Sequence, residues 1–596
     1  MQICREPNRY AMRTIYLLLL SLLIWNSSPA QQFYRVLNDT LARSPGDSRS
    51  VNIVDVNGDG WDDVFITNGP QGGENNMLFI NNGDGTFTRI WNDTIVKDHS
   101  PSDGATFADV DNDGDLDCYV VTWYNQKNYF YLNNGDGTFT RPGIYPFELV
   151  NTYSETASWG DYDGNGWVDL YITNSAGNQK NLLYRNDGMN QGVMVFTKID
   201  NQPPVAQAKT SRSANWVDVN NDGKPDLFVS HESNELNDLF INMGGGNFQQ
   251  MSGDPLVTAL ASSISSSWGD VDNDGDMDVV IANSGNFQPQ NNMLFLNNGD
   301  GSFTRVTTGD LVNDGGCSYG STMYDMDNDG DLDIFITNGF CNGVIKNFYY
   351  RNEGNGIFVR DTTTFPDLTT PASYGVACGD LNNDGWPDVV VATCKNTSQS
   401  PNPVDLVYYS TPGTNHWLKV KLTGIVSNRS AIGARIKVKA MISGVPVWQT
   451  REVSSQTGYC GQNSLTQHFG LKDALIADSL IVYWPSGLIT VLTGIAAGQT
   501  ISITETSSSG VDLHKAGKAK VYPNPTSGRV TIVSEEKLPV PSSLFMTDVF
   551  GRNINFHTVS AAGNSLVLDL HGLAGGVYFL RSNEPGRDFN FRIVVI

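Results

Sequence analysis

The sequence predicts an all-β chain in which a seven-bladed β-propeller is followed by a small β-domain and a C-terminal β-sandwich-like domain. Three observations lead to this prediction. An aspartate-rich motif such as "DVDNDGDLD" occurs seven times at intervals of 52 to 57 residues, short β-branched and aromatic runs flank each copy, and Asn-Gly or Asp-Gly dipeptides separate the runs. A fixed period of this size is typical of repeat architectures, and such dipeptides are typical of hairpin turns.

The N-terminus is expected to direct export. Arg5, Arg9 and Arg13 precede the apolar run "TIYLLLLSLLIW", and "SPA" follows it, which is the pattern of a cleavable signal peptide. The run is shorter than the roughly 20 residues that span a bilayer. We therefore expect residues 1–30 to be removed, with Met12 as an alternative start. The mature chain should be soluble and have no transmembrane helix.

Each repeat is expected to form one propeller blade of four antiparallel strands. An apolar stretch such as "SSWGD" leads into the aspartate loop, and a β-branched run such as "DVFITN" leaves it. A third run such as "NMLFINN" and a fourth such as "GTFTRI" follow, with a Gly-containing turn between them. The turns of the type "NNGDGTF" are interpreted as hairpins without a metal.

Ring closure can also be read from the sequence. The seventh repeat lacks its fourth strand, because "TPGTNHWLKV" begins a different pattern, whereas residues 32–36 ("QFYRV") match the fourth strands of the other repeats. We expect the propeller to comprise residues 31–414, with an N-terminal strand at 32–37 completing blade 7. Such pairing would cover two exposed sheet edges.

The aspartate loops are candidate calcium sites. We number them 1 to 7 along the chain, and their shared pattern is D-x-[DN]-x-[DN]-G-x-x-D. Oxygen atoms at positions 1, 3, 5 and 9, together with the backbone carbonyl of position 7, can converge on one cation, and hard oxygen ligands in a flexible loop favour Ca²⁺ over Zn²⁺ or Mg²⁺. Position 6 is always glycine, which permits the sharp reversal that the loop needs.

These five positions per loop predict up to seven Ca²⁺, one per blade. The candidate ligands are Asp55, Asn57, Asp59, Trp61 and Asp63; Asp109, Asp111, Asp113, Asp115 and Asp117; Asp161, Asp163, Asn165, Trp167 and Asp169; Asp218, Asn220, Asp222, Lys224 and Asp226; Asp270, Asp272, Asp274, Asp276 and Asp278; Asp325, Asp327, Asp329, Asp331 and Asp333; and Asp380, Asn382, Asp384, Trp386 and Asp388.

The acidity of the chain is consistent with this interpretation. The loops hold 3, 4, 3, 3, 4, 4 and 3 aspartates at positions 1, 3, 5 and 9, which is 24 of the 63 acidic residues, and seven Ca²⁺ would change the net charge from -25 to -11. Scattered basic residues in so acidic a chain argue against nucleic acid as a partner. The alternatives are plain Asn/Asp/Gly turns, which seven copies in phase disfavour, and EF-hands, which need flanking helices and a terminal glutamate.

Six cysteines remain after the signal, and an even number in an exported chain permits disulfides. If loop 6 joins an antiparallel hairpin, Cys317 and Cys341 lie opposite each other, because they are equally distant from its two ends. We predict that bridge and leave the other pairings open. The spacing does not resemble a zinc site.

The search for a catalytic set favours a protein that is not an enzyme. Residues 316–320 ("GCSYG") match GxSxG, but they lead into an aspartate loop instead of a strand-to-helix turn. His416 and His468 are interpreted as packed or surface residues. Trp123 and Tyr124 follow the second strand of blade 2, where they either pack in the core or contact a ligand such as a sugar.

Three stretches resemble known families. Repeats such as "SSWGDVDNDGDMDVVIANSG" resemble the FG-GAP or VCBS repeats of integrin-α-like propellers, and "NHWLKVKLTGIVSNRSAIGARIKVKA" with "DSLIVYWPSGLIT" resembles an ASPIC/UnbV domain at 415–505. The pairing is similar to that of the cartilage acidic protein family. After a polar linker at 506–519, "VYPNPTSGRVTI" and "LAGGVYFLR" resemble the type IX secretion C-terminal sorting domain of Bacteroidetes, at 520–596.

The resemblances imply export through the periplasm by the type IX machinery, to the outer-membrane surface or beyond. We expect a secreted or cell-surface calcium-binding propeller that acts in adhesion or binds a glycan or protein ligand. The alternative is a secreted polysaccharide-active enzyme such as a lyase, since a propeller can host such a site. A purely structural role is the third possibility.

Overall fold

The computed structural model describes residues 32–506 except 286, 343–345, 367, 369–371 and 396–402. It also describes residues 519–595 except 523–527, 535–537, 539–540, 549–551, 563, 574–575 and 583–589. The predicted signal peptide therefore lies outside the described residues. None of the helices in the described part is long and apolar enough to cross a membrane. The chain divides into two compact units, 1–509 and 510–596.

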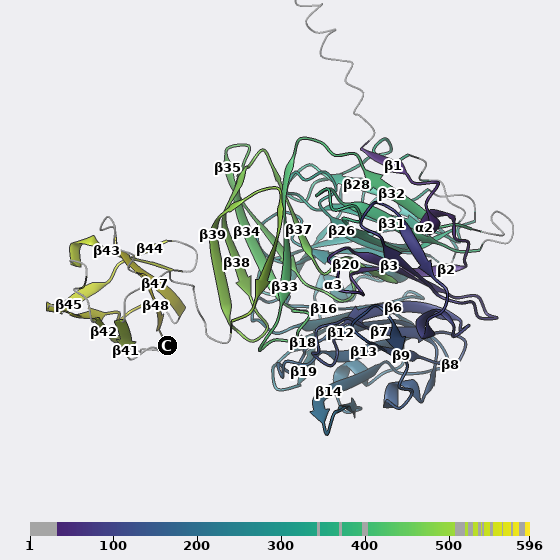
Figure 1. Ribbon diagram of the computed structural model, residues 1–596, viewed down its shortest axis with the longest axis horizontal. Coiled ribbons are helices and arrows are strands. Elements are labelled where there is room, and N and C mark those ends of the chain that lie inside the picture. The colour runs from purple at the N-terminus through teal and green to yellow at the C-terminus, as the bar shows by residue number, and fades with distance from the viewer. Residues whose placement is uncertain are drawn as a thin grey trace, which may run out of the picture. The chain divides into compact units, whose positions relative to one another are not determined.

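The first unit confirms the predicted all-β, propeller-like fold (Figure 1). Its repeated four-stranded antiparallel sheets, which we call blades 1 to 7, have the following strands, from the innermost outward: β2 (Ser48–Val54), β3 (Asp63–Asn68), β4 (Met77–Asn81) and β5 (Phe87–Ile90); β6 (Ser102–Ala108), β7 (Asp117–Thr122), β9 (Tyr129–Asn133) and β10 (Phe139–Thr140); β12 (Ser154–Gly160), β13 (Asp169–Asn174), β14 (Leu182–Asn190) and β15 (Val193–Ile199); β16 (Ser211–Val217), β17 (Asp226–His231), β18 (Asp238–Asn242) and β19 (Phe248–Gln250); β20 (Ser263–Gly269), β21 (Asp278–Asn283), β23 (Met293–Asn297) and β24 (Phe303–Val306); β26 (Ser318–Tyr324), β27 (Asp333–Asn338), β28 (Phe348–Asn352) and β29 (Phe358–Arg360); and β30 (Ser373–Gly379), β31 (Asp388–Thr393), β32 (Leu406–Ser410) and β1 (Phe33–Arg35).

The innermost strands form a closed ring. Each contacts the innermost strand of the next blade, and β30 contacts β2. The N-terminal strand β1 pairs antiparallel with β32, with Phe33 opposite Ser410 and Arg35 opposite Tyr408. The last sheet therefore contains strands from both ends of the propeller sequence.

Short elements connect neighbouring blades. They are α2 (Thr40–Arg43), η1 (Thr94–Val96), η2 (Pro146–Glu148), η3 (Pro203–Val205), α3 (Pro255–Thr258), and two small sheets, β8 (Gln126–Lys127) with β11 (Asn151–Thr152) and β22 (Gln290–Asn291) with β25 (Gly315–Gly316). Asp93 shows how such an element is held: its Oδ1 caps η1 by accepting from the Ile95 amide, and its Oδ2 accepts from the Phe139 amide of blade 2.

Glycine at the end of an inner strand lets the blades pack closely. A Cβ at Gly160 in blade 3 would lie 2.5 Å from Cδ1 of Trp216 in blade 4, and a Cβ at Gly269 would lie 2.6 Å from Leu332. These contacts explain the "WGD" sequences that precede loops 3 and 5. A larger residue would force the neighbouring blade away.

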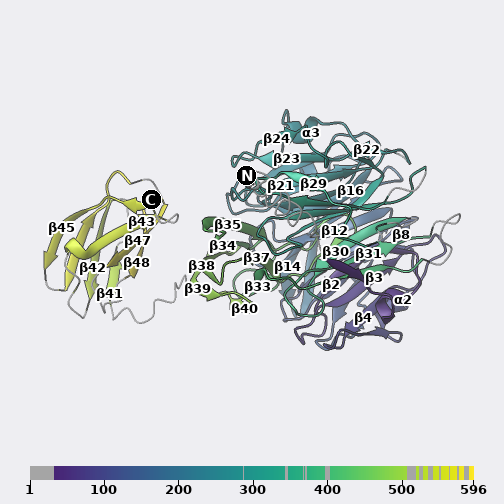
Figure 2. The same cartoon turned by 90° about the horizontal axis from the view of Figure 1, so that it is seen from above.

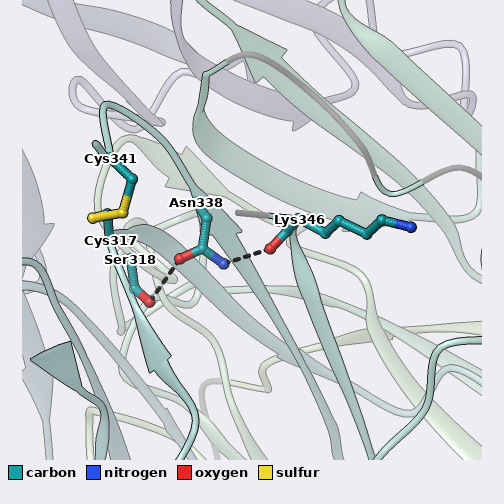
Figure 3. The surroundings of a disulfide bond; sticks show 5 residues. All are labelled: Cys317, Ser318, Asn338, Cys341 and Lys346. Carbon is teal, nitrogen blue, oxygen red and sulfur yellow. Dashed lines mark hydrogen bonds between the residues drawn. A yellow bond between two sulfur atoms is a disulfide. The ribbon is translucent and has the colours of Figure 1, made fainter. Parts of the chain in front are cut away.

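One disulfide joins Cys317, next to β26, to Cys341, which follows β27, with Cα atoms 5.6 Å apart (Figure 3). The predicted pairing is therefore present. Ser318 of the GxSxG match lies on β26, and its hydroxyl donates to Asn338 Oδ1 at 3.1 Å. Four further cysteines are buried and free: Cys118, Cys378, Cys394 and Cys460.

Residues after the propeller form a β-domain that we call the cap, and its strands lie against the ring (Figure 2). They are β33 (His416–Thr423), β34 (Arg435–Ile442), β35 (Val445–Glu452), β36 (Gly461–Gln462), β37 (Gln467–Lys472), β38 (Ile476–Tyr483), β39 (Ile489–Ala496) and β40 (Gln499–Thr504). They form the sheets β37-β33-β40 and β35-β34-β38-β39, while β36 instead extends blade 1 by pairing in parallel with β2.

The second unit contains two further sheets, β41-β42-β46-β45 and β44-β43-β47-β48. Side chains from both, including Val530, Leu568, Leu580 and Ile593, form one buried cluster, as in a sandwich. Its elements are β41 (Ala519–Tyr522), β42 (Arg529–Ser534), η4 (Pro541–Ser543), β43 (Leu544–Asp548), β44 (Asn553–Ile554), β45 (His557–Ala562), β46 (Ser565–Asp569), β47 (Gly576–Ser582) and β48 (Asn590–Val595).

Candidate metal centres in the blade loops

Each aspartate loop connects the innermost strand of a blade to the second strand, and its two ends are held in the same way throughout. The position-1 carboxylate accepts, through Oδ2, the amide of the position-6 glycine at 2.8 to 3.2 Å in all seven loops. That glycine has φ between 82° and 113°, a backbone conformation that other residues rarely adopt. Oδ1 of position 1 has no hydrogen-bond partner in loops 1, 2 and 5, whereas in loops 3, 4, 6 and 7 it accepts a further amide of the loop.

The position-9 aspartate begins the second strand and is held by two backbone amides. In loop 2, Asp117 Oδ2 accepts from the Val110 amide at 3.0 Å, and Asp117 Oδ1 accepts from the Asn133 amide at 3.0 Å. The equivalent pair of bonds occurs in every loop, at 2.7 to 3.1 Å. Position 9 thus also ties the loop to the third strand, a role that sequence reasoning missed.

The asparagine that ends the third strand is a second residue that the sequence interpretation overlooked. Asn133 of blade 2 donates from Nδ2 to the carbonyl of Val56, in loop 1 of the preceding blade, at 2.7 Å. Asn186, Asn242, Asn297 and Asn352 make the same contact to the preceding loop. The available signal was the single asparagine that recurs at this point of blades 1 to 6, and the sequence interpretation assigned it to the hairpin alone.

Carboxylates converge in four loops. The groups whose ligand atoms lie within 4.8 Å of one another are Asp109, Asp111 and Asp117 in loop 2; Asp161, Asp163 and Asp169 in loop 3; Asp270, Asp272 and Asp278 in loop 5; and Asp325, Asp327 and Asp329 in loop 6. Positions 1, 3 and 9 therefore meet in three loops, and positions 1, 3 and 5 in the fourth. The remaining predicted ligands lie in the same seven loops, and their roles stay predictions.

Buried oxygen atoms without a hydrogen-bond partner indicate that these clusters fit a cation. Asp109 Oδ1 and Asp270 Oδ1 are both in this state, in residues that are 2% and 0% exposed, and so is Asp55 Oδ1 in loop 1, whose side chain is 10% exposed. A buried carboxylate oxygen without a partner is unfavourable unless a positive ligand or a proton compensates it. Oxygen-only donor sets of this kind suit Ca²⁺.

Without a cation, the same carboxylates are held in an unfavourable state. Burial and then the charge of Asp113 raise the pKa of Asp109 to about 7 and that of Asp111 to about 6. Burial and then the charge of Asp111 also raise the pKa of Asp117 well above its usual range. These groups therefore require either protons or a cation near neutral pH.

The "NNGDGTF" turns differ from the loops in their electrostatics. Asp84 is exposed, and its Oδ1 accepts from the Thr86 amide at 3.0 Å and from the Thr86 hydroxyl at 2.6 Å. The bonds from Thr86 lower the pKa of Asp84, whereas burial raises the pKa of the loop aspartates. Asp136 and Asp300 make equivalent bonds in blades 2 and 5. The aspartate in these turns therefore stabilises a hairpin.

A segment of the cap, residues 453–466, runs along the inside of the ring, and we call it the plug. It contacts the innermost strand of every blade through these pairs: Gly461 with Val51, Gln462 with Phe107, Ser455 with Trp159, Gln456 with Asn215, Tyr459 with Ser265, and Asn463 with Thr322 and Cys378. The small and polar residues of "SSQTGYCGQN" can therefore satisfy the inward-facing backbone and side-chain groups.

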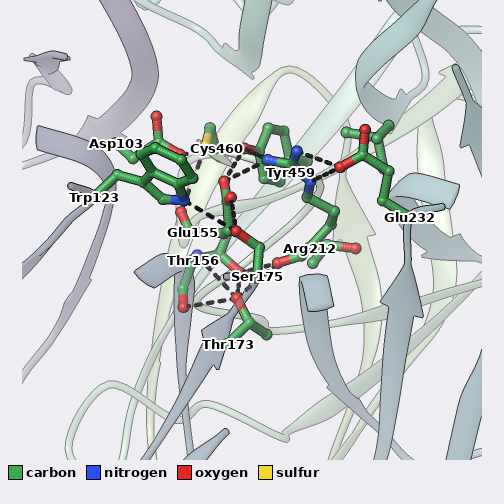
Figure 4. A network of polar contacts seen from close by, with 12 residues as sticks. Asp103, Trp123, Glu155, Thr156, Thr173, Ser175, Arg212, Glu232, Tyr459 and Cys460 are labelled. Carbon is green, nitrogen blue, oxygen red and sulfur yellow. Dashed lines mark hydrogen bonds and ion pairs between the residues drawn. The ribbon is translucent and has the colours of Figure 1, made fainter. Parts of the chain in front are cut away.

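The tip of the plug reaches a polar network (Figure 4). Its members Asp103, Glu155 and Tyr459 are buried, and Asp103 and Glu155 lie near the start of β6 and β12, at the strand ends away from the metal loops. The Tyr459 hydroxyl donates to Glu155 Oε2 at 2.6 Å and lies 3.2 Å from Asp103 Oδ2, and Arg212 pairs with Glu155 at 2.6 Å. Burial and then the charge of Glu155 raise the pKa of Asp103 well above its usual range. Burial opposes ionisation of Glu155, but Arg212 lowers its pKa.

Family models match most of the chain. A model described as FG-GAP-like repeat matches residues 55–120, 109–172, 161–229, 218–281, 270–336 and 337–391. A model described as ASPIC and UnbV matches residues 424–510, and one described as secretion system C-terminal sorting domain matches residues 520–596. These matches confirm the three resemblances seen in the sequence, and the last indicates export by type IX secretion to the cell surface or outside.

Two proteins called cartilage acidic protein 1 are similar to the chain over part of their length. The chain is 24% identical over 437 residues to cartilage acidic protein 1 of Xenopus tropicalis, covering 67% of this chain and 64% of the relative. It is 23% identical over 492 residues to the Homo sapiens protein of the same name, covering 76% and 71%. The chain thus spans less than two thirds of the Xenopus relative.

Similarity to solved structures is weaker. The fucose-specific lectin from Aleuria aurantia (Hg-derivative form) is 10% identical, covering 54% of this chain and 97% of that chain, with a TM-score of 0.31. A score this low supports no conclusion about fold or ligand.

Proposed function

Because the chain belongs to the FG-GAP-like repeat family, we propose that it is an exported, calcium-binding protein whose propeller binds an extracellular glycan or surface protein. The observation that carries the calcium assignment is the convergence of buried carboxylates that include the unpartnered Asp109 Oδ1 and Asp270 Oδ1. A bound Ca²⁺ would neutralise the repulsion among these carboxylates. Because position 1 follows the first strand of a blade and position 9 begins its second strand, the bound ion would hold these two strands together at the loop.

Export to the surface is supported at both ends of the chain. The C-terminal match indicates the type IX pathway, and the charged and apolar N-terminal pattern predicts a signal for entry into the periplasm. We propose that the protein acts on the outer surface or is released. Mass spectrometry of the mature protein would contradict this proposal if residues 1–30 were retained in the exported form.

The propeller face opposite the metal loops is the proposed binding face, because cap residues contact the loop side. Trp123 packs edge-to-face with Tyr124 and Tyr153, with ring centroids 4.7 and 5.1 Å apart, and all three are partly exposed. Tyr124 also has φ of 61°, an uncommon conformation for a bulky residue. Partly exposed aromatic rings of this kind suit stacking against sugars or contact with a protein.

We propose that the protein binds its ligand without chemical conversion. The test is to incubate the purified protein, in calcium-loaded and in calcium-depleted form, with a panel of acidic polysaccharides, and to measure both binding and products. Saturable binding that Trp123→Ala weakens, with no new reducing ends or double bonds, is the expected result. Product formation would contradict the binding role and favour the polysaccharide-active enzyme.

A further inference from the structure

The seven loops fall into two classes according to the residue at position 3. Loops 2, 3, 5 and 6 have aspartate, whereas loops 1, 4 and 7 have Asn57, Asn220 and Asn382. In loops 1 and 7 the asparagine Nδ2 donates, at 3.0 Å, to the position-5 carboxylates of Asp59 and Asp384. An asparagine oxygen can still bind a cation, so the class difference needs a second observation.

The second observation is that the same three loops receive a basic side chain from the cap at position 1. Loop 7 shows the clearest case, because Lys419 Nζ lies 2.5 Å from Asp380 Oδ2 and 2.9 Å from Asn383 Oδ1. The Lys419 and Asp380 side chains are 7% and 2% exposed. Salt and water screen such a buried pair only weakly, so Lys419 acts as a fixed positive charge beside the loop.

Loop 4 has two basic partners. Arg435 Nη2 donates to the Asp218 carbonyl oxygen at 2.6 Å and lies 3.8 Å from Asp218 Oδ2, and the Arg435 side chain is only 9% exposed. Arg435 also pairs with Glu452 of the cap at 3.2 Å, so its charge is shared between the two carboxylates. Lys224, at position 7 of the loop, pairs with Asp222 at position 5 at 2.7 Å, but it is 43% exposed and solvent therefore screens its charge. Two of the carboxylates that a cation would need therefore already face a protein cation.

Loop 1 has the weakest of the three contacts. Lys421 Nζ lies 3.1 Å from Asp55 Oδ2, but the Lys421 side chain is 48% exposed. Solvent therefore screens this charge more than that of Lys419. The expected effect on a cation is largest in loop 7 and smallest in loop 1.

The other four loops have no ion pair at position 1 among the described residues, although the charge of the buried cap residue Arg451 also acts on Asp270 and Asp325 without forming an ion pair with them. Lys472 lies 3.4 Å from Asp329 at position 5 of loop 6, and Arg185 lies 3.9 Å from Asp163 at position 3 of loop 3. Both basic side chains are about 40% exposed, at 42% and 39%, so solvent screens them. These are also the loops in which three carboxylates converge.

We propose that loops 2, 3, 5 and 6 hold tightly bound divalent cations, whereas in loops 1, 4 and 7 the basic residues Lys421, Arg435 and Lys419 of the cap neutralise the position-1 aspartate. This inference rests on the proposed calcium binding and refines it from up to seven ions to four tight ones. The two lysines contact Oδ2, which also accepts the glycine amide, and Arg435 donates to the Asp218 carbonyl oxygen, so each basic group weakens an ion by repulsion without filling its place. We expect calcium affinity at loop 7 to be ~100-fold or more lower than at loop 2.

The test is to count tightly bound calcium in the full exported chain. Calcium-loaded protein is dialysed against metal-depleted buffer and measured by elemental analysis, and the affinities are measured by competition with a chromophoric chelator. Four tight ions are expected. Lys419→Met should add a fifth, because it removes the buried charge at loop 7. Lys439→Met is the matched control, since Lys439 lies on the same cap 5.8 Å from the Trp448 ring, and it should leave four.

A second pair of variants keeps the proposal testable if Lys419→Met does not fold. Asp113 and Asp384 both occupy position 5, in loop 2 and loop 7 respectively, and each accepts the amide of position 7. Asp113→Ala should lower the number of tight ions to three, whereas Asp384→Ala should leave four. Seven equivalent ions in the parent protein, or equal loss from both variants, would overturn the two classes but leave calcium binding intact. No bound calcium at all would instead overturn the proposed function.

Discussion

Replacing Tyr459 with phenylalanine is expected to destabilise the propeller, because it removes one hydroxyl from the buried polar network of Tyr459, Glu155, Asp103 and Arg212 at the tip of the plug, which we call the latch. Tyr459 is fully buried, and its hydroxyl lies 2.6 Å from Glu155 Oε2 and 2.9 Å from the Tyr374 hydroxyl. A hydrogen bond to a charged group contributes about 1.5–3 kcal/mol to the free energy of unfolding. Glu155 keeps its ion pair with Arg212 at 2.6 Å, so we expect a loss of about 2 kcal/mol.

The assay is urea denaturation of the calcium-loaded protein near neutral pH, followed by tryptophan fluorescence and by amide exchange of the peptide containing residues 455–463. Tyr374→Phe is the matched control, because the Tyr374 hydroxyl lies 2.9 Å from the neutral Tyr459 hydroxyl and reaches Asp103 Oδ1 only at 3.5 Å, so its loss should cost about 1 kcal/mol. Faster exchange in the plug should accompany the lower stability. A Tyr459→Phe loss below about 0.5 kcal/mol with unchanged exchange would refute the latch.

Three other perturbations test the loops and the blade packing. Chelation should lower the melting temperature, and the rise in melting temperature on adding calcium should be larger at about pH 8 than at about pH 5. The reason is that the calcium-free fold raises the pKa of Asp109 from 3.8 to about 7, so the calcium-free protein loses stability as pH rises from about 3.8 to about 7. A rise in melting temperature that does not depend on pH would contradict this. Joint substitution of Asp109 and Asp113 by alanine should remove about one bound ion, whereas Asp84→Ala should remove none; equal loss in elemental analysis would erase the distinction between loops and hairpins. Gly160→Ala should lower the free energy of unfolding by about 1–3 kcal/mol in thermal or urea denaturation, because the alanine Cβ would lie 2.5 Å from Trp216 of the next blade. Unchanged stability would show that the two blades can move apart at no cost.

Local pattern was sufficient to predict much of the propeller. The period of the aspartate loops located the first and second strands of each blade, and the match of residues 32–36 to other fourth strands located the partner of β32. The Cys317–Cys341 pair followed from hairpin register alone. Each of these predictions depends on residues that are close in sequence or are repeated.

The features that were missed depend on contacts between distant segments. Apart from Tyr459 and Cys460, the plug sequence "SSQTGYCGQN" contains only small and polar residues, which are typical of any exposed loop, and nothing local indicates that seven strands surround it. Asp103 and Glu155 likewise follow a serine at the start of an inner strand, and only the ring brings them to Tyr459. The second role of the position-9 aspartate was hidden because one residue type serves both metal binding and strand anchoring.

Elemental analysis of the exported protein after dialysis against metal-depleted buffer is the most direct measurement of the central claim, that buried aspartates recur because they hold divalent cations. The account predicts tightly held calcium in a small whole-number ratio to the chain, with four ions as the expected value. Protein that keeps its full thermal stability while containing essentially no calcium or other divalent metal would contradict it.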